Sequence, residues 1–290
     1  FYTPPANDDC ANAEAVVGPF PTNVTGTNLG ATVDCPGVLD WNAVWYSIDL
    51  PYGMNLVEID MCLDDAGATI SNTGIILTAD CSCDPLSFIY STNEYVVSGN
   101  CITELNFEVA GPATVYYPAF IDPAGDFNFD INVSELFSID GQVTYYNNGT
   151  PMELITVTLD DGSDAIVATT NTDVNGYYSF ENVPAGTYTL AGMTIKDPGG
   201  IALADVNLAV GHLLGATLTG LAFEAADVTD DAAVSVADVN LIVSELLGNS
   251  PTWAAPDWIF ENPVVSLPSK VTQDFQAVCS GDVDELFFDL

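Results

Sequence analysis

The chain has 290 residues, of which 41 are acidic and only two, Lys196 and Lys270, are basic, so its formal net charge is −39. Nucleic acid and anionic membrane surfaces repel such a chain, which excludes both as partners. The length suits two or three domains, and the 48% of hydrophobic residues is enough for packed cores.

The first 136 residues are predicted to be all-β. Alternating or β-branched segments recur between turn residues, which is typical of a two-sheet sandwich or jelly roll. One exception is a predicted helical turn near residues 8–15, with Asn7 or Asp8 as its N-cap. The seven expected strands are 44–50, 56–62, 73–78, 87–91, 102–109, 114–121 and 126–133.

Six of the seven cysteines lie within the first 101 residues. An even number in a β-rich region predicts three disulfides formed in an oxidising compartment. A reduced, buried set is the alternative, and zinc is disfavoured because the one histidine, His212, is distant in sequence. The sequence does not set the pairing, but the neighbours Cys81 and Cys83 are expected to reach different partners. Cys279 is left over, either free or linked to another chain.

A second all-β block is predicted from residue 138 to about residue 193. Tight turns rich in Gly and Asn, such as Asn147-Asn148-Gly149 and Asn175-Gly176, separate its strands. The expected strands are 138–146, 155–159, 165–171, 177–183 and 187–191. Three further strands, 258–260, 264–267 and 271–278, are expected in the tail.

Between these β segments the hydrophobic period changes from two to about 3.6. Residues 201–215 and 234–248 form an internal repeat with the shared frame Ala-Asp-Val-Asn-Leu. Each copy is predicted to be a helix with one buried apolar face, ended by a glycine at position 215 or 248. The expected buried residues are Val206, Ala209, Val210, Leu213, Leu214, Val239, Ile242, Val243, Leu246 and Leu247.

The twelve residues that begin at Asp227 carry oxygen atoms at the spacing of a calcium loop. Ala232 departs from this pattern, because glycine is usual at the sixth position. An Asp-rich capped turn without metal is the alternative. The side chains at positions 1, 3, 5, 9 and 12, and the backbone carbonyl at position 7, belong to Asp227, Thr229, Asp231, Ser235, Asp238 and Ala233.

The first copy of the repeat has lost the early part of this loop. When Asp205 is aligned with Asp238, the early ligand positions hold Thr194, Lys196 and Pro198. Near the end of the sequence, Asp282 and Asp284 look like the opposite half, loop-opening ligands with no helix after them. We therefore predict a composite Ca²⁺ site in which these two complete the shell that Asp205 begins, with Asp197 as a further candidate. A solvated acidic tail is the alternative.

The duplicated loop and helix resemble a dockerin, the calcium-binding module of secreted bacterial proteins. The block from residue 138 carries Gly141-Gln-Val, residues 172–180 and residues 183–188, and it resembles the small collagen-adhesin B-type or carboxypeptidase-regulatory-like sandwich. Such modules are spacers and stalks on surface proteins, so the resemblance implies no catalysis. The tail from residue 258 resembles a segment that follows dockerin-like repeats in large secreted bacterial proteins. In that pattern the last strands rejoin the small sandwich.

Residues 7–13, Val44-Trp45-Tyr46 and residues 125–128 are similar to a secreted β-sandwich that accompanies such modules. The expected fold is therefore mainly β. A disulfide-containing sandwich or jelly roll covers residues 1–136, and an Ig-like sandwich comprises residues 137–193 and 254–290. A dockerin-like helical pair, residues 194–253, is inserted before the last strands.

Signals of an enzyme are missing, and we expect no catalytic residues and no enzyme activity. His212 lies on a predicted helix without a second histidine or an arginine, which leaves Ser-His-Asp and Cys-His arrangements unsupported. A glycosidase with paired carboxylates stays open as an alternative, but in so acidic a chain such pairs carry almost no information. No apolar run is long enough to span a bilayer, and no signal peptide precedes Phe1, so a secreted or cell-surface protein would begin after its cleavage.

Two functional interpretations remain. In the first, the chain is a subunit of an extracellular filament or surface layer. Its aromatic ends, residues 1–5 and 286–290, would be buried in a neighbouring copy, with calcium controlling folding and polymerisation. Ends that fold back onto their own domains are the alternative. In the second, it is a surface adhesin or glycan-binding protein that docks on a partner through the dockerin-like module. The candidates for stacking on sugars are Trp41, Trp45, Trp253 and Trp258.

Overall fold

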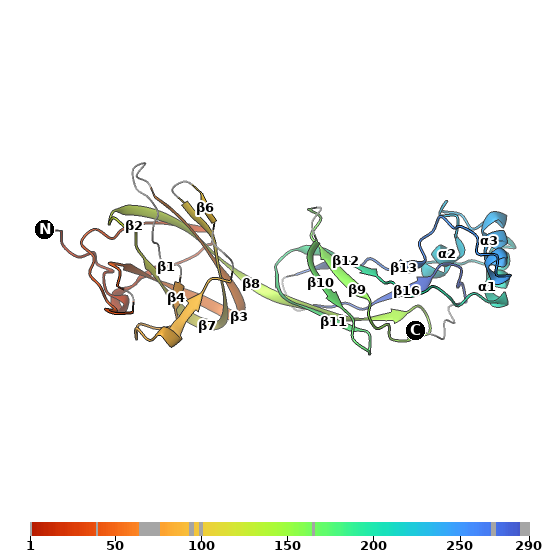
Figure 1. Ribbon diagram of the computed structural model, residues 1–290, viewed down its shortest axis with the longest axis horizontal. Helices are drawn as coiled ribbons and strands as arrows, with labels where there is room; N and C mark the ends of the chain where they lie inside the picture. Colours follow the sequence, from red (N-terminus) through yellow and green to blue (C-terminus); the bar gives the residue numbers. More distant parts are fainter. Residues whose placement is uncertain are drawn as a thin grey trace. The chain divides into compact units, whose positions relative to one another are not determined.

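The computed structural model describes residues 2–38, 40–63, 76–92, 96–98, 101–163, 166–267 and 271–284. It divides into two compact units, Phe1–Leu136 and Phe137–Leu290. The fold is mainly β, as the sequence predicts, and Figure 1 shows the α-helices of the described residues gathered in the second unit.

The first unit is built around long antiparallel strands. In the centre, β3 (Val44–Leu63) pairs with β7 (Cys101–Ala119) on one side and with the first half of β8 (Asp126–Tyr145) on the other. The remaining strands of this unit are β1 (Glu14–Val16) on β3, β2 (Thr22–Thr27) on β8, β4 (Ile76–Thr78) and β6 (Val96–Ser98) on β7, and β5 (Phe88–Tyr90) on β4.

The sequence divides β3 and β7 into two strands each, and that division is wrong. Pro51-Tyr52-Gly53 makes a bulge within β3, and Gly53 lies opposite Gly111 of β7, where the partner strand also has a Gly-Pro step. A Cβ at Gly111 would collide with the backbone carbonyl of Pro51. Turn residues that face each other on paired strands therefore bend both strands without ending either.

The first unit has one main apolar core. Inward-facing aromatic residues of β3, β7 and β8 fill it, and Phe129 makes edge-to-face contacts with both Tyr46 and Tyr117. The helical turn predicted near residues 8–15 is a short 3₁₀ helix, η1 (Cys10–Asn12), and β1 follows it. Asp8 does not cap it, because its carboxylate accepts hydrogen bonds from the N–H and hydroxyl of Thr32.

Disulfides join segments of this unit that are distant in sequence. Cys10 bonds to Cys81 and Cys35 bonds to Cys83, so the two close neighbours reach different partners, as predicted. Cys101 is disulfide-bonded as well, and its register partner on β3 is Cys62. Cys279, in the second unit, is a free thiol and fully buried, which does not fit the alternative of a link to another chain.

The second unit is a two-sheet sandwich. One sheet contains the second half of β8 with β11 (Tyr177–Pro184), β15 (Val271–Thr272), β16 (Phe275–Cys279) and, on β16, β13 (Trp258–Phe260). The other has the order β10 (Ile166–Asn171), β9 (Thr156–Asp160), β12 (Thr187–Met193) and β14 (Val264–Ser266). The tail strands thus pair with strands from the block that begins at residue 138.

Three helices lie between β12 and β13. They are α1 (Leu203–Leu213), α2 (Leu221–Ala226) and α3 (Val236–Leu246). The sequence predicts α1 and α3 and misses α2, which is too short to show a helical period. As Figure 1 shows, the three are grouped beside β13 and β16, against which α2 packs.

The prediction of one buried face along the whole of each repeat helix is wrong at the C-terminal ends. Ala209 of α1 and Ile242 of α3 are fully buried, but the leucines one turn later are not. These leucines lie in the last turn or at the C-cap, beyond the small core that the helices share with α2. Exposed fractions are 40% for Leu213, 84% for Leu214, 38% for Leu246 and 71% for Leu247.

Candidate metal centre

The loop between α2 and α3 closes around the carboxylate of Asp238. This residue is the third of α3 and is fully buried. Its Oδ2 accepts hydrogen bonds from the N–H and hydroxyl of Ser235, both at 2.8 Å. Its Oδ1 accepts from the N–H of Thr229 at 2.9 Å and from the Thr229 hydroxyl at 2.8 Å. Burial alone would raise the pKa of Asp238, but these hydrogen bonds outweigh it and lower the pKa.

The remaining predicted ligands of this loop lie around the same turn. Asp227 is almost buried, and its Oδ1 accepts from the N–H of Asp231 at 3.2 Å. The Asp231 side chain is exposed to solvent, and its carboxylate accepts a hydrogen bond from the N–H of Ala233. Ala232, at the position where glycine is usual, has φ of +65°. The loop therefore keeps its left-handed residue although the side chain there carries a Cβ.

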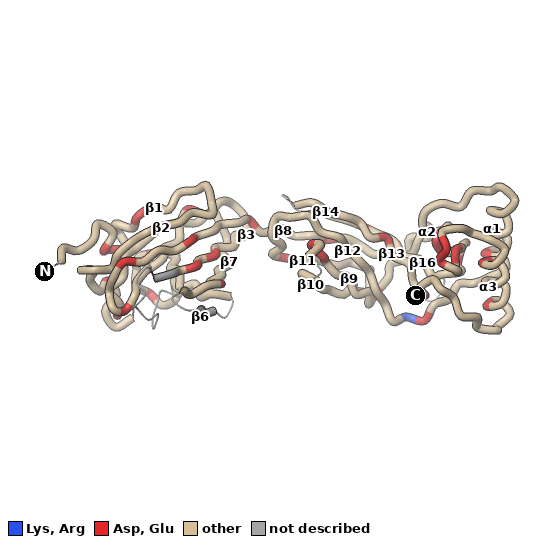
Figure 2. The backbone as a smooth tube through the Cα atoms, turned by 90° about the horizontal axis from the view of Figure 1, so that it is seen from above, with Lys and Arg blue, Asp and Glu red and all other residues tan. Residues whose placement is uncertain are grey.

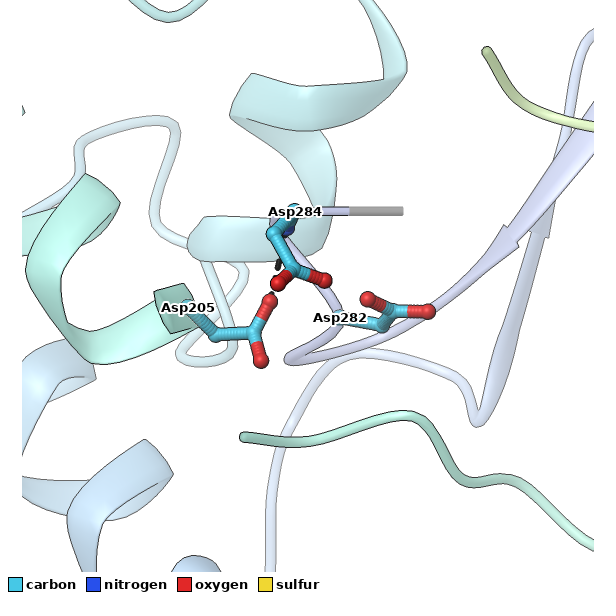
Figure 3. Close-up of side chains that lie close together, drawn as sticks. All are labelled: Asp205, Asp282 and Asp284. Carbon is cyan, nitrogen blue, oxygen red and sulfur yellow. Dashed lines mark hydrogen bonds between the residues drawn. The ribbon is translucent and has the colours of Figure 1, made fainter. Parts of the chain in front are cut away.

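A second group of carboxylates lies beside the start of α1 (Figure 3). Asp205, Asp282 and Asp284 each place one carboxylate oxygen within 4.8 Å of the others, and this cluster could hold a metal ion. Asp205 belongs to α1, whereas Asp282 and Asp284 follow β16 in the tail. Asp205 and Asp282 are fully buried, and Asp284 is half-buried. Asp197, the further candidate, is exposed and outside the cluster.

Hydrogen bonds at Asp205 repeat those at Asp238. Asp205 Oδ2 accepts from the N–H of Ala202 at 2.5 Å, as Asp238 Oδ2 does from Ser235 three residues earlier. Asp205 Oδ1 accepts from the N–H of Asp284 at 2.7 Å, as Asp238 Oδ1 does from Thr229. The tail residue Asp284 therefore takes the place that Thr229 has in the continuous loop.

The residues next to these donors correspond as well. Val228 precedes Thr229 and Val283 precedes Asp284, and both valines are buried in the same small core with Ala209 and Ile242. Asp282, two positions before Asp284, thus occupies the place of Asp227. The segment 282–284 supplies to α1 what the segment 227–229 supplies to α3.

Two residues that the sequence analysis missed hold Asp282 in place. The hydroxyl of Tyr145, on β8, donates to Asp282 Oδ2 at 2.5 Å and accepts from the N–H of Cys279 at 3.1 Å. Gly200 has φ of +92°, and a Cβ there would overlap the Asp282 carboxylate. Neither residue is near Asp282 in sequence, so only the tertiary structure brings them to it.

Like charges lie close together in this cluster. Burial raises the pKa of Asp282 to about 7, the hydrogen bond from Tyr145 opposes that rise, and the charges of Asp205 and Asp284 add to it. Burial likewise raises the pKa of Asp205. None of the groups that shift these two pKa values is a cation. Figure 2 shows acidic positions distributed over both units, and the chain has only two basic residues.

Other candidates from the sequence have structural roles. His212 lies in the last turn of α1, where its Nδ1 accepts a hydrogen bond from the N–H of Leu218. Trp45 and Trp258 are 2% and 8% exposed, so stacking on a sugar is excluded for both, because their faces are covered by core residues. Trp41 stacks on Phe120, and Trp253 packs against the small helical core. None of the helices in the described residues is long and apolar enough to cross a bilayer.

Comparison with known proteins gives one family match. Residues 138–192 match the carboxypeptidase regulatory-like domain, in agreement with the resemblance noted from the sequence. This match covers the first strands of the second unit and none of the proposed metal ligands. No curated protein matches the chain.

Several solved structures of pilins are similar to parts of the chain. The major pilin subunit BcpA of Bacillus cereus is 14% identical, with 90% of this chain and 71% of that chain covered and a TM-score of 0.29. The T6 backbone pilin of Streptococcus pyogenes is 14% identical, with coverage of 63% and 50% and a TM-score of 0.23. The major pilin RrgB of Streptococcus pneumoniae is 11% identical, with coverage of 54% and 32% and a TM-score of 0.19. At these TM-scores the likeness carries no functional assignment.

Proposed function

We propose that this chain is a non-enzymatic structural protein, secreted or on the cell surface, that two calcium ions stabilise. One ion binds in the loop of residues 227–238, and the other binds at Asp205, Asp282 and Asp284. In this proposal residues 194–253 are a dockerin-like helical pair inserted into an Ig-like sandwich of residues 137–193 and 254–290. The observation that carries the proposal is the matching set of hydrogen bonds at Asp205 and Asp238.

Calcium is favoured over other metals by the kind of ligand. Every side chain in both sites offers oxygen, as hard divalent cations prefer, and no histidine or cysteine belongs to the cluster at Asp205. Calcium accepts six to eight oxygens in flexible geometry, which suits carboxylates that come from separate segments. A divalent ion would also offset the repulsion between these neighbouring carboxylates.

Self-assembly into a filament or surface layer is the second part of the proposal. The contact would use the aromatic terminal segments, of which residues 1 and 286–290 lie outside the described residues, while Tyr2 is 73% exposed. A charge of −39 opposes contact between copies unless cations screen or bridge it. Calcium therefore acts on folding and on assembly together.

Electron microscopy of the purified chain with calcium and with excess chelator tests this proposal. Filaments or sheets that form with calcium and disperse in chelator are the expected result. The Asp282→Asn/Asp284→Asn double variant should need more calcium to assemble, whereas Glu153→Gln/Glu181→Gln, which removes two charges elsewhere in the same unit, should behave as the parent. Assembly that ignores both the chelator and the variant would contradict a role for calcium.

A second candidate function is a surface adhesin that docks on a partner through the helical pair. It is favoured by the exposed leucines at the ends of α1 and α3, of which Leu214 and Leu247 are 84% and 71% exposed. Equivalent residues of the two repeats would then form the docking surface. Calcium-loaded protein that stays monomeric, and loses binding to a surface extract on Leu214→Ser/Leu247→Ser substitution, would favour this function over assembly.

A further inference from the structure

A pocket in the second unit takes no part in the proposed metal coordination. Its volume is about 580 Å³, within the usual range for ligand pockets. It lies between the segment that precedes α1, the last turn of α3 and the segment that follows α3. The larger apolar residues of its lining are Pro198, Ile201, Leu246, Pro251 and Trp253. The pocket therefore offers apolar surface that a partner can cover.

Trp253 is half-buried and is held by one end of its indole ring. A Cβ on Gly281 would lie 2.5 Å from the far edge of the six-membered ring and 2.8 Å from Ile201, so both side chains pack directly on this glycine. The N–H group is at the opposite end of the indole and points away from that contact. Among the described residues it has no acceptor, and its nitrogen is not buried, whereas the N–H of Trp258 donates to the carbonyl of Lys196. Trp253 can therefore donate to a carbonyl oxygen of a partner.

Backbone hydrogen bonds hold the walls of the pocket. The N–H groups of Ala254 and Ala255 both donate to the carbonyl of Val228, at 3.1 and 3.3 Å. The N–H of Ser280 donates to the carbonyl of Asp257 at 3.0 Å. The pocket is thus formed before a partner arrives, which lowers the entropy cost of binding.

The charge at the pocket limits what can enter it. Glu245 and Asp257 are the charged residues of its described lining, and both are acidic. Their carboxylates repel an acidic segment, but they accept hydrogen bonds from neutral donors such as hydroxyl groups. An occupant that comes from this chain should therefore have apolar rings, hydroxyl groups and no acidic residue.

The segment of residues 2–5 has these properties. Tyr2-Thr3-Pro4-Pro5 carries two hydroxyl groups and three rings, and residues 1–7 contain no charged side chain. Tyr2 is 73% exposed, and residues 2–5 belong to no helix or strand. Two consecutive prolines favour an extended polyproline conformation, which aromatic-lined pockets bind at low entropy cost.

The other chain end fits the pocket less well. Residues 285–290 include Glu285 and Asp289, which the carboxylates of the pocket repel. They also belong to the same unit as the pocket, so their exchange between two copies would close a dimer. Residues 2–5 belong to the first unit, so their contact with the pocket of a second copy joins unlike surfaces and repeats into an open chain of copies.

We propose that this pocket receives residues 2–5 of a neighbouring copy. The proline rings pack on Trp253, a backbone carbonyl of the segment accepts from Trp253 Nε1, and the Tyr2 hydroxyl donates to Glu245 or Asp257. This contact rests on the proposed function, because it is the surface that receives one chain end when copies assemble.

Isothermal titration with a peptide of residues 1–7, acetylated and amidated so that neither end adds a charge, tests the contact. The receptor is the calcium-loaded full chain with Tyr2→Ser, whose own segment lacks the aromatic ring. We expect saturable binding that weakens about tenfold when the peptide carries Tyr2→Ala. Trp253→Phe in the receptor, which removes the N–H and keeps an aromatic ring, should weaken binding about fivefold, as expected for one lost hydrogen bond.

Two equivalent leucines of the repeat provide a matched pair of receptor variants. Leu246→Asp places a charge on the apolar wall and should weaken peptide binding about tenfold. Leu213→Asp changes the equivalent residue of α1, which is outside the pocket, and should leave binding unchanged. The two leucines are 38% and 40% exposed, so the substitutions should affect folding equally.

A mixture of two variants tests the same contact in the assembly. Tyr2→Ser keeps an intact pocket, and Leu246→Asp keeps an intact segment. Each alone should stay monomeric in calcium by light scattering after gel filtration. The equimolar mixture should form dimers, which the single remaining contact joins, and no longer chains.

Absence of peptide binding, or equal binding by Leu246→Asp and Leu213→Asp, would overturn this contact. If Leu246→Asp forms calcium-dependent filaments as well as the parent does, the pocket is not the receptor, although the proposed function stands. If the parent stays monomeric but the peptide binds in the pocket, assembly is wrong and the contact is supported. If circular dichroism shows that Leu246→Asp does not fold, Trp253→Phe takes its place in these comparisons.

Discussion

The continuous loop before α3 and the composite site at the start of α1 surround an equivalent aspartate with similar groups, but the chain connections differ. In the first, Asp227 and Asp238 lie eleven positions apart on one short segment. In the second, Asp205 and its partners Asp282 and Asp284 are separated by much of the second unit, yet the two backbone N–H groups that donate to Asp205 match those that donate to Asp238. A ligand shell thus depends on where backbone N–H groups and carboxylates lie in space, and the order of segments along the chain is free to change.

The largest effect should come from removing calcium from both loops. An ion at about a hundred times its Kd contributes about 2.7 kcal/mol, and two ions contribute about 5 kcal/mol. For a domain of about 150 residues this is a fall in Tm of roughly 10–20 °C. Scanning calorimetry with and without chelator should show the fall in the transition of the second unit, while the disulfide-bonded first unit keeps its Tm. If neither transition moves, the two loops do not bind stabilising metal.

Separate substitution of the two loops tests whether each holds its own ion. Asp282→Asn/Asp284→Asn and Asp227→Asn/Asp231→Asn should each reduce the bound calcium from two ions to one by atomic emission after gel filtration. The composite variant should also speed amide exchange in β16, because its site fastens the tail to α1, and the continuous-loop variant should not. Glu153→Gln/Glu181→Gln is the matched control and should retain both ions. If the Asp282→Asn/Asp284→Asn variant still binds two calcium ions, the composite site does not exist.

The composite site should also differ in its response to pH when metal is absent. Burial raises the pKa of Asp282 to about 7 in the folded protein, whereas an aspartate in the unfolded chain has a pKa of about 3.9. The folded state therefore binds the proton more tightly, so the free energy of unfolding in chelator should fall as pH rises from about 4 to about 7.

Urea titrations between these pH values would measure that fall. Asp282→Asn should abolish most of it, and Asp274→Asn, an exposed change nearby, should not. With calcium present the trend should reverse, because metal binding requires ionised carboxylates. If the stability of the metal-free protein rises over the same pH range, Asp282 is not buried in its protonated form.

The smallest effect on stability is expected at Ala232 of the continuous loop. The segment 282–284 of the composite site has no residue equivalent to it. Its φ of +65° is a region that costs an L-residue about 1 kcal/mol and costs glycine little. Ala232→Gly should therefore raise the free energy of unfolding by about 1 kcal/mol. Ala237→Gly, within α3, is the control and should lower it by a similar amount, about 1 kcal/mol. Urea denaturation of both variants checks the pair, and a destabilising Ala232→Gly would show that the left-handed backbone is not strained.

The sequence was sufficient for features that depend on local patterns. Alternation predicted the β units, and the repeat placed α1, α3 and their glycine caps. The repeat also aligned Asp205 with Asp238, which led to the pairing of Asp205 with the tail. It was insufficient where contacts between distant segments decide the outcome, as at Tyr145 and Gly200 around Asp282. The same holds for the leucines at the helix ends, whose exposure depends on how far the small core extends.

The composite site has a consequence for the order in which the protein matures. Asp282 follows Asp205 by 77 positions, so α1 leaves the ribosome long before the segment that completes its carboxylate cluster. Until residues 282–284 arrive, Asp205 lacks the N–H of Asp284 and the small helical core lacks Val283. Under the proposed function, capture of the second calcium ion would mark a chain that has been delivered as far as residues 282–284, and proteases would remove truncated copies that never reach that state.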